Sequence, residues 1–356
     1  MDLDFGLPRI KNMQSLIGKK IVVTGGSGFL GKFVLNRLRE HGASEIFVPR
    51  SRDYDLRDRE EVQRLYAEQG PEILIHLAAT VGGIGANRRN PGRFFCENMA
   101  MGLHVIDEAR RYGQLEKLVI IGTTCSYPKF TPTPFREEEL WNGYPEETNA
   151  PYGIAKKALL VMAQGYREQY GLPSIYLVPA NLYGPGDNFD PESSHVIPAL
   201  IRKFVHAKEI ASASVEVWGT GSVSREFLYA EDAAEGIVLA TLRYEGKGPV
   251  NLGTGNEIRI KELVDDIQKL VGYEGEIVWN TAQPDGQPRR RLDVQKALLE
   301  FGFQAQTDLR TGLAKTIEWY QETLSGEAAG SQGSIGFGRS VGDSDNRVLR
   351  AHGRSN

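Results

Sequence analysis

The sequence predicts an α/β protein, a doubly wound parallel sheet with a smaller α/β domain on its carboxyl-terminal side. Short apolar runs alternate with segments of helical periodicity over the first half of the chain, which is the pattern of βαβ units. These runs are continuous, without polar alternation, as expected for strands that helices cover on both faces. Such sheets bind ligands at the carboxyl ends of their strands, so we expect functional residues directly after these runs.

The expected strands and helices follow one another in order along the chain. The apolar runs that we interpret as strands are KIVVTG from residue 20, EIFVPR from 45, EILIHLAA from 72, KLVIIG from 117 and SIYLVPA from 174. The helical segments between them are 29–42, 60–70, 93–111 and 151–170. After residue 181 the pattern loosens, and from 250 to about 323 short strands and helices alternate irregularly. We therefore assign residues 1–180, with a return segment at about 225–252, to the sheet domain and 181–324 mainly to the smaller domain.

Composition and charge narrow the class of protein. The chain has 356 residues, of which 40% are hydrophobic and 25% charged, as in an ordinary globular protein. A formal net charge of -4 disfavours nucleic acid and anionic membranes as partners, and no apolar run approaches the ~20 residues of a membrane span. With only two cysteines and an acidic start that lacks a secretion signal, we expect a cytoplasmic protein. Residues 325–356 are rich in Gly and Ser, and we expect a disordered tail there.

The glycine-rich segment TGGSGFLG at 24–31 follows the first apolar run and opens an amphipathic helix. In a Rossmann fold this arrangement places a pyrophosphate at the amino end of the helix, where backbone N–H groups and the helix dipole attract it. A purely structural turn is the alternative, but the strand-turn-helix context favours dinucleotide binding. We therefore predict a dinucleotide cofactor held by Gly25, Ser27, Gly28, Phe29, Leu30 and Gly31.

The turn after the second strand predicts which dinucleotide binds. NAD-preferring sites carry an acidic residue there, whereas this chain has Arg50 and Arg52, whose guanidinium groups suit an additional 2′-phosphate. We therefore predict NADP(H). The alternative is a solvated basic turn, because Asp53 and Asp55 follow closely. The other residues that we assign to the cofactor are Asp55, Leu56, Ala78 and Ala79.

Tyr152 and Lys156 lie four residues apart in a predicted helix and therefore share one face of it. An ammonium beside a phenol lowers the phenol pKa from about 10, so this pair can deliver a proton to a carbonyl oxygen whose carbon receives hydride. Thr123 follows the strand that begins at residue 117, so its hydroxyl is expected at the same edge of the sheet. Tyr-x-x-x-Lys is also common on ordinary amphipathic helices, but Thr123 favours the catalytic interpretation.

These motifs resemble the extended short-chain dehydrogenase/reductases and, within that family, the enzymes that make GDP-L-fucose. The matching segments are HLAATVGGIGAN at 76–87, ENM at 97–99, GTTCSYPK at 122–129, APYGIAKKA at 150–158, NLYGPGDNFDPESSHVIPAL at 181–200, WGTGSVSREFLY at 218–229 and PDGQPRRRLDV at 284–294. The resemblance runs from about residue 19 to about residue 322. It implies conversion of GDP-4-keto-6-deoxy-D-mannose to GDP-L-fucose, by epimerisation at C3 and C5 followed by reduction of the C4 ketone with NADPH.

The resemblance also implies roles for single residues. Tyr152 is the implied proton donor, Lys156 holds the nicotinamide ribose, and Thr123 supplies the hydroxyl, although the family has Ser-Ser-Cys where this chain has Thr-Thr-Cys. Cys125 and His195 are the implied acid-base pair of epimerisation. Inversion needs such a pair, because one group removes a proton on one face while another delivers it on the opposite face. From spacing alone, a buried structural cysteine and a helix-starting histidine are the alternatives.

The sugar nucleotide is expected to contact a further set of residues. By resemblance, these are Asn181, Val196, Arg202, Trp218, Arg225 and Asp285. Arg202 and Arg225 are expected near the diphosphate, because guanidinium forks match phosphate oxygens. Trp218 is expected to cover the base, with a place in the core at the domain junction as the alternative. Cys96 is expected in the core, and one arginine of the run 289–291 is expected to reach the site, the others being solvated.

The sequence therefore predicts a bifunctional NADP(H)-dependent epimerase-reductase that acts on a GDP-sugar and needs no metal, since no Cys/His spacing resembles a ligand set. A related nucleotide-sugar 4-reductase, 4-epimerase or 3,5-epimerase is the alternative within the class, because fold does not fix substrate. Outside the class, the alternative is a catalytically silent NADP-binding sensor or scaffold. The resemblance also implies a homodimer, formed by a four-helix contact of the helices that begin at about residues 92 and 151.

Overall fold

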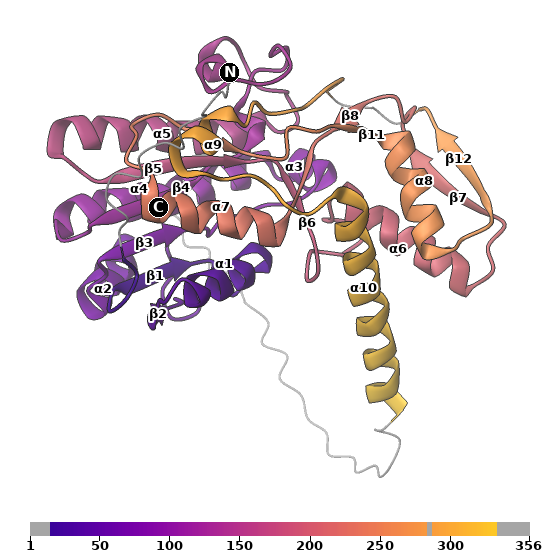
Figure 1. The fold of residues 1–356 in the computed structure, drawn as a ribbon, viewed down its shortest axis with the longest axis horizontal. Helices are drawn as coiled ribbons and strands as arrows, with labels where there is room; N and C mark the ends of the chain where they lie inside the picture. The colour runs from indigo at the N-terminus through magenta and orange to yellow at the C-terminus, as the bar shows by residue number, and fades with distance from the viewer. Residues whose placement is uncertain (1–14, 283–286, 333–356) are drawn as a thin grey trace, which may run out of the picture.

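The computed structural model describes residues 15–282 and 287–332 of the chain (Figure 1). The predicted sheet is confirmed as six parallel strands in the order β10-β5-β4-β3-β1-β2. The strands are β1 (Lys20–Thr24), β2 (Glu45–Phe47), β3 (Ile73–His76), β4 (Lys117–Ile121), β5 (Ser174–Pro179) and β10 (Val250–Leu252). The strand order reverses between β1 and β3, and the crevice at such a switch point is where doubly wound sheets bind ligands.

Helices cover both faces of this sheet (Figure 1). They are α1 (Phe29–Glu40), α2 (Arg59–Gln69), α3 (Ile84–Arg89), α4 (Pro91–Tyr112), α5 (Ala150–Tyr170), α7 (Ala230–Arg243) and α9 (Gln295–Phe301). Helix α4 packs against α2 and α5, whereas α1 packs against α7 on the other face. Right-handed crossovers explain why α1 and α4 lie on opposite faces, because the chain moves from β1 to β2 in one direction and from β3 to β4 in the other.

Local sequence signals mark where these helices begin and end. Both long helices, α4 and α5, have proline in the first turn, where its missing N–H costs nothing. They end at Gly113 and Gly171, whose φ angles of 67° and 72° are the left-handed values that favour glycine. Helix α2 begins after Asp58, whose side chain accepts a hydrogen bond from the Glu60 N–H. These signals fix the loops on which the candidate site is built.

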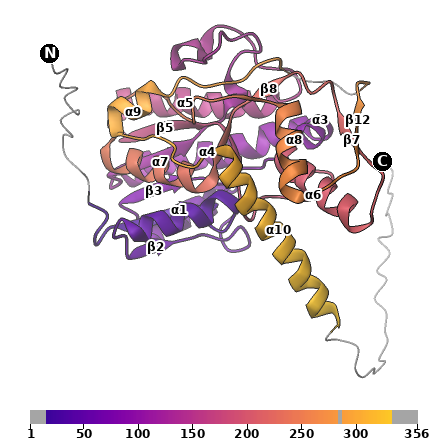
Figure 2. The ribbon, with the colours of Figure 1, turned by 45° about the vertical axis from the view of Figure 1, so that its right-hand side comes forward.

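A second hydrophobic cluster lies beside the sheet (Figure 2). The elements of this region are α6 (Val196–Glu209), α8 (Ile260–Val271), α10 (Leu309–Gln332), β6 (Asn181–Tyr183), β7 (Ser214–Trp218), β8 (Ser224–Arg225), β9 (Phe227–Tyr229), β11 (Ile258–Arg259) and β12 (Glu276–Asn280). The pairs β12-β7 and β6-β9 are parallel, and β11-β8 is antiparallel. Helix α10 packs against α8 near its start and then projects away from both regions (Figures 1 and 2).

Three expectations need comment after this description. Helix α10 continues to Gln332, beyond Ser325 where the tail was expected to begin, and residues 333–356 lie outside the described part. Asp285 lies in the undescribed segment 283–286. The expectation that Cys96 belongs to the core is wrong, because this residue of α4 is exposed. Within the described residues, no helix has both the length and the apolarity needed to cross a lipid bilayer.

Candidate active site

The glycine-rich turn lies between β1 and α1, at the switch point of the sheet. Gly25 has a φ of 72°, and a Cβ there would lie 2.7 Å from the backbone nitrogen of Ala78, so only glycine fits. A Cβ on Gly31 would collide with the Gly25 carbonyl oxygen. Helix α1 has Gly28 as its N-cap, and within the described part of the chain no side-chain cap bonds its first N–H groups, which leaves them available to an anion. The turn therefore has the shape that a dinucleotide pyrophosphate requires.

A buried pair, Thr24 and His76, connects this turn to the end of β3. The Thr24 Oγ1 lies 2.8 Å from His76 Nδ1 and also accepts a hydrogen bond from the Ala78 N–H at 3.4 Å. Burial lowers the pKa of His76 to about 3, with a smaller contribution from the charge of Lys156, so the imidazole is neutral at physiological pH. Sequence reasoning missed both residues, although a threonine and a histidine at the ends of two apolar strands were the available signal.

The two arginines expected at the 2′-phosphate lie in the turn after β2, which is next to β1 in the sheet. Arg50 and Arg52 are both exposed. The Arg52 Nε contacts the Asp53 carboxylate at 3.4 Å, so the solvated-turn interpretation remains as a competitor. Ala78 and Ala79, which follow β3, are partly buried at the neighbouring strand end.

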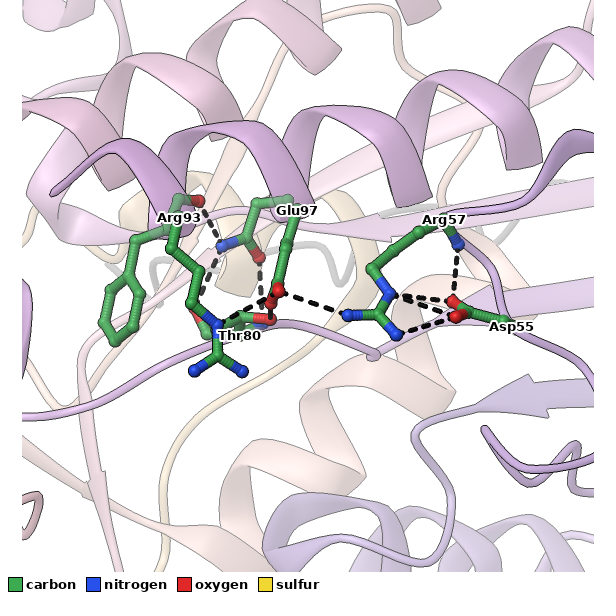
Figure 3. A network of polar contacts seen from close by, with 7 residues as sticks. Asp55, Arg57, Thr80, Arg93 and Glu97 are labelled. Atoms are coloured by element: carbon green, nitrogen blue, oxygen red, sulfur yellow. Dashed lines mark hydrogen bonds and ion pairs between the residues drawn. The ribbon is translucent and has the colours of Figure 1, made fainter. Parts of the chain in front are cut away.

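A polar network on the α4 side ties two of the predicted cofactor loops together (Figure 3). Asp55 pairs with Arg57 at 2.7 Å, and the same arginine reaches Glu97 of α4 at 3.1 Å. Glu97 also accepts a hydrogen bond from the Thr80 hydroxyl at 2.6 Å and contacts Arg93 at 3.0 Å. These contacts, first with Thr80 and then with the arginines, hold the Glu97 pKa below its ordinary value. The network fixes the loop that carries Asp55 and buried Leu56 relative to the loop after β3.

The segment after β4 meets the start of α5 at very short range. Thr123 accepts a hydrogen bond from the Cys125 N–H at 3.1 Å and so caps a short 3-10 turn, η1 (Thr124–Ser126). A Cβ on Gly153 would collide with the Cys125 carbonyl oxygen, and the Ser126 hydroxyl donates to the Gly153 carbonyl at 2.9 Å. This approach brings Tyr152, the residue before Gly153, to Thr123 and Cys125.

The ionisation of Tyr152 differs from the sequence-based expectation. Burial raises its pKa, the nearby charge of Cys125 raises it further, and a hydrogen bond with Thr123 partly offsets the rise. The expected lowering by Lys156 is therefore wrong in this structure. Lys156 is 2% exposed, and burial lowers its own pKa to about 8. The phenol is thus protonated at neutral pH, which is the state that a proton donor needs.

Cys125 has a neighbour that the sequence did not identify. One guanidinium nitrogen of Arg290, Nη1, lies 3.8 Å from the Cys125 sulfur. Arg290 is 8% exposed and is held by two hydrogen bonds, of 3.3 and 3.0 Å, to the Gln287 side-chain oxygen. The expectation that one arginine of 289–291 reaches the site thus resolves to Arg290, and the exposed Arg289 pairs with Glu257 instead.

His195 enters from another segment, as the N-cap of α6. Its ring keeps an exposed surface, yet the protein around it is sufficient to lower its pKa. The loop before it packs on the segment after β3, since the Gly83 N–H donates to the Ser193 carbonyl at 2.9 Å. Both His195 and Cys125 lie in the described residues, and no hydrogen bond joins them. The structure therefore brings Thr123, Tyr152 and Cys125 together, whereas His195 comes from a separate segment at the start of α6.

The residues expected at the sugar nucleotide lie mostly on the second cluster. Val196 begins α6 and packs against this cluster, while the Asn181 side chain donates to the Glu226 carbonyl at 2.8 Å. Arg202 of α6 has a buried Nε without a hydrogen-bond partner. Trp218 ends β7 and is 62% exposed, so the core interpretation of this residue is wrong. Lys203 lies over its ring at 5.7 Å from the centroid, and Arg225 lies in β8.

Across the residues that the structure describes, no three His, Cys, Asp or Glu side chains gather in a way that could hold a metal ion. The candidate site itself offers hydroxyl, phenol, ammonium, thiol and guanidinium groups.

The chain is similar in sequence and in structure to known proteins. The model of the NAD dependent epimerase/dehydratase family matches residues 21–253. A rice protein, "Probable GDP-L-fucose synthase 1" of Oryza sativa subsp. japonica, is 41% identical over 307 residues, covering 86% of this chain and 93% of that protein. A solved GDP-L-fucose synthetase of Naegleria fowleri bound to NADP superimposes with a TM-score of 0.81 at 28% identity, over 88% and 98% of the two chains. A GDP-6-OMe-4-keto-L-xylo-heptose reductase of C. jejuni superimposes with a TM-score of 0.80 at 29% identity, over 88% and 100%.

Proposed function

The chain belongs to the NAD dependent epimerase/dehydratase family, and we propose that it converts GDP-4-keto-6-deoxy-D-mannose to GDP-L-fucose by C3/C5 epimerisation and C4 reduction. One observation carries this proposal beyond family membership. A hydroxyl, a phenol and a thiol meet at the carboxyl end of β4, so groups suited to reduction and to epimerisation share one place. A reductase alone would need no thiol there.

NADP(H) is the cofactor of this reaction, and the residues present fit it. The glycine-rich turn has no room for a Cβ at Gly25, and no side-chain cap is seen at the start of α1 in the described residues. Both features suit a pyrophosphate. We assign the 2′-phosphate to exposed Arg50 and Arg52. We assign the nicotinamide ribose to Lys156 and leave the adenine side to Asp55 and Leu56. When bound, NADPH supplies the hydride for C4.

Epimerisation is assigned to Cys125 and His195. C3 and C5 flank the C4 ketone, so their protons are acidic and one group can remove such a proton while the other supplies one from the opposite face. The lowered pKa of His195 makes its imidazole mainly neutral at physiological pH, the form that accepts a proton. His195 is an exposed residue, so we expect it to exchange its proton with solvent between the two inversions.

Reduction is assigned to Tyr152, with Thr123 and Lys156 in support. The phenol is protonated at neutral pH because burial and the Cys125 charge raise its pKa, so it holds the proton that the C4 oxygen needs. The Thr123 hydroxyl accepts from the Cys125 N–H and also hydrogen-bonds Tyr152, which fixes the phenol against η1. Its β-methyl group restricts its rotamers compared with the serine of the family.

The sugar nucleotide is assigned to the second cluster. Among the described residues the buried Nε atom of Arg202 has no hydrogen-bond partner, so it is a donor that an anionic diphosphate would satisfy, and Arg225 is the second cation. The exposed indole of Trp218 is a flat apolar surface for the base. Asn181, Val196 and Asp285 complete the proposed contacts. We keep residues 1–180 with 225–252 as the proposed cofactor domain and 181–324 as the proposed substrate domain.

We also propose a homodimer that works in the cytoplasm. Three large apolar side chains are exposed on the two helices expected at the contact, namely Phe95 and Leu103 of α4 and Val161 of α5. A second copy would cover them in a four-helix contact. Light scattering should then give twice the 39.5 kDa chain mass, and Leu103→Glu should give the monomer. A monomeric unmodified protein would contradict the dimer. Two free cysteines fit a reducing compartment, which imaging of a fluorescent fusion can check.

The decisive experiment is the reaction of GDP-4-keto-6-deoxy-D-mannose with NADPH in deuterated water. NMR and mass spectrometry of the product should show GDP-L-fucose with deuterium at C3 and C5 and stoichiometric oxidation of NADPH. Reduction without deuterium at these carbons would favour a simple 4-reductase, the alternative that the similarity to the C. jejuni reductase supports. Cofactor that cycles without net oxidation would indicate a 4-epimerase. Binding of NADPH without turnover of any 4-keto sugar would indicate a sensor.

A further inference from the structure

Arg290 is a buried cation that forms no ion pair with any carboxylate of the described residues. Its guanidinium group is surrounded by protein, yet within the described ranges no carboxylate oxygen lies inside the 4.0 Å of an ion pair. Its recorded partners are the neutral amide oxygen of Gln287 and the sulfur of Cys125. A buried charge that is left uncompensated is strongly destabilising. Of the two partners, only Cys125 can become an anion.

The backbone around Arg290 is built to hold it in this place. The Arg290 carbonyl accepts a hydrogen bond from the Glu226 N–H at 3.0 Å, and the buried Glu226 carboxylate accepts from the Leu292 N–H at 2.6 Å. Gln287 is fixed in turn, because its side-chain nitrogen donates to the Lys129 carbonyl at 2.7 Å, just beyond η1. The guanidinium is therefore anchored to the same stretch of chain that carries the thiol.

We infer that Arg290 is a positioning residue that holds Cys125 as a thiolate, and that this sets the base for epimerisation. The inference deepens the proposed function, on which its catalytic part rests. In the step itself the thiolate sulfur bonds to the proton of the carbon beside C4, the C–H bond breaks, and its electron pair moves onto the C4 oxygen. A neutral thiol cannot accept that proton, so the charge of Arg290 decides whether the step begins.

The ionisation of Cys125 can be tested without any substrate. The rate at which iodoacetamide alkylates each cysteine is measured by peptide mass spectrometry at pH 6.5 and at pH 9.5. For each cysteine, the rate at pH 9.5 is divided by the rate at pH 6.5. This ratio is independent of how accessible the cysteine is. The alkylation rate of an ordinary thiol is about a hundredfold lower at pH 6.5 than at pH 9.5, because only the thiolate reacts. Exposed Cys96 serves as the internal reference. We expect the rate ratio of Cys125, the flat ratio, to be at least about tenfold smaller than the steep ratio of Cys96. A tenfold difference corresponds to the smallest pKa shift that an adjacent opposite charge usually causes.

Three variants separate charge from structure. Arg290→Gln should return Cys125 to the steep ratio, whereas Arg290→Lys keeps a cation and should retain much of the flat one. Arg289→Gln is the matched control, because this neighbour is exposed and pairs with Glu257. A Cys125 ratio equally flat in Arg290→Gln and in the unmodified protein would overturn the inference. If Arg290→Gln does not fold, the unmodified protein still decides, because a Cys125 ratio as steep as that of Cys96 overturns it.

The enzymatic arm distinguishes this inference from the proposed function. With GDP-4-keto-6-deoxy-D-mannose in deuterated water, Arg290→Gln should slow incorporation at C3 and C5 by about tenfold or more, and Arg289→Gln should leave it unchanged. An unmodified protein that incorporates no deuterium while Cys125 shows the flat ratio would defeat the proposed function and leave the thiolate in place. Incorporation with a steep Cys125 ratio would defeat the inference and leave the function in place.

Discussion

Replacing His76 with glutamine should make the folded protein less sensitive to acid. The imidazole is 1% exposed, and burial together with the charge of Lys156 lowers its pKa to about 3. In the unfolded chain a histidine has a pKa of about 6.5. Between these two pH values the histidine is protonated in the unfolded state but not in the native state. The contribution of His76 to the free energy of unfolding is therefore complete above pH 6.5 and is lost as the pH falls towards 3.

The size of the effect follows from linkage. Each pH unit below 6.5 costs the native state about 1.4 kcal/mol at this one group, or about 2.7 kcal/mol at pH 4.5. Glutamine keeps a polar group beside the Thr24 hydroxyl but does not titrate, so the variant lacks this loss. The unmodified protein should therefore lose about 2.7 kcal/mol relative to His76→Gln between pH 7.5 and 4.5, whatever their difference at neutral pH.

Urea unfolding followed by circular dichroism at pH 7.5, 6.5, 5.5 and 4.5 measures this difference. Comparing the two proteins at each pH cancels the carboxylates that they share, and equal m-values confirm that the same unfolding is measured. His206→Gln is the control, because this histidine of α6 is exposed. Stability curves for His76→Gln and the unmodified protein that run parallel from pH 7.5 to 4.5 would refute the argument that His76 is held neutral.

Four further substitutions test other parts of the structure. Tyr152→Phe should lower kcat for reduction by about 10²- to 10⁴-fold while leaving NADPH binding intact, and an unchanged rate would remove the phenol from the mechanism. Arg52→Ala should weaken NADPH binding by about tenfold or more with little effect on NADH, and equal effects on both would support the solvated turn. Gly153→Ala should cost about 1–3 kcal/mol in urea unfolding, because the new methyl group meets the Cys125 carbonyl, and wild-type stability would contradict that contact. Burial raises the pKa of Asp187 to about 7. The contribution of this carboxyl group to the free energy of unfolding is therefore complete below its unfolded pKa and is lost as the pH rises through 7. Asp187→Asn should raise the melting temperature more at pH 8 than at pH 5, and a shift independent of pH would contradict this.

The sheet is predictable from sequence because its strands need apolar side chains on both faces. The residues Ile73–Ile75 and Leu118–Ile120 are buried without interruption, and such runs need no knowledge of distant contacts. Lys117 shows where this reasoning stops. It begins β4, is buried, and pairs with Glu245, which lies 128 residues away in sequence. No local pattern indicates that a lysine in a strand will have such a partner.

The candidate site also combines features that local sequence predicts with features that depend on distant contacts. The positions of Thr123 and Tyr152 follow from two local rules, the strand-end rule and helical spacing. The direction of the Tyr152 pKa does not, because it depends on how deeply the whole fold buries the phenol. Arg290 lies 165 residues from Cys125, and nothing in the run of three arginines shows which one turns inwards. Burial and long-range pairing are properties of the assembled fold, and they decide the ionisation of this site.

The charge of Cys125 links the two halves of the proposed reaction. While the thiol is ionised, its charge helps to raise the pKa of Tyr152 and so keeps the proton on the phenol. When the thiolate takes a proton from the sugar, that charge disappears, and one of the two causes that hold the proton on Tyr152 is removed. The phenol then gives up its proton more readily. Proton removal at carbon therefore prepares proton donation to the C4 oxygen, which is the order that epimerisation before reduction requires.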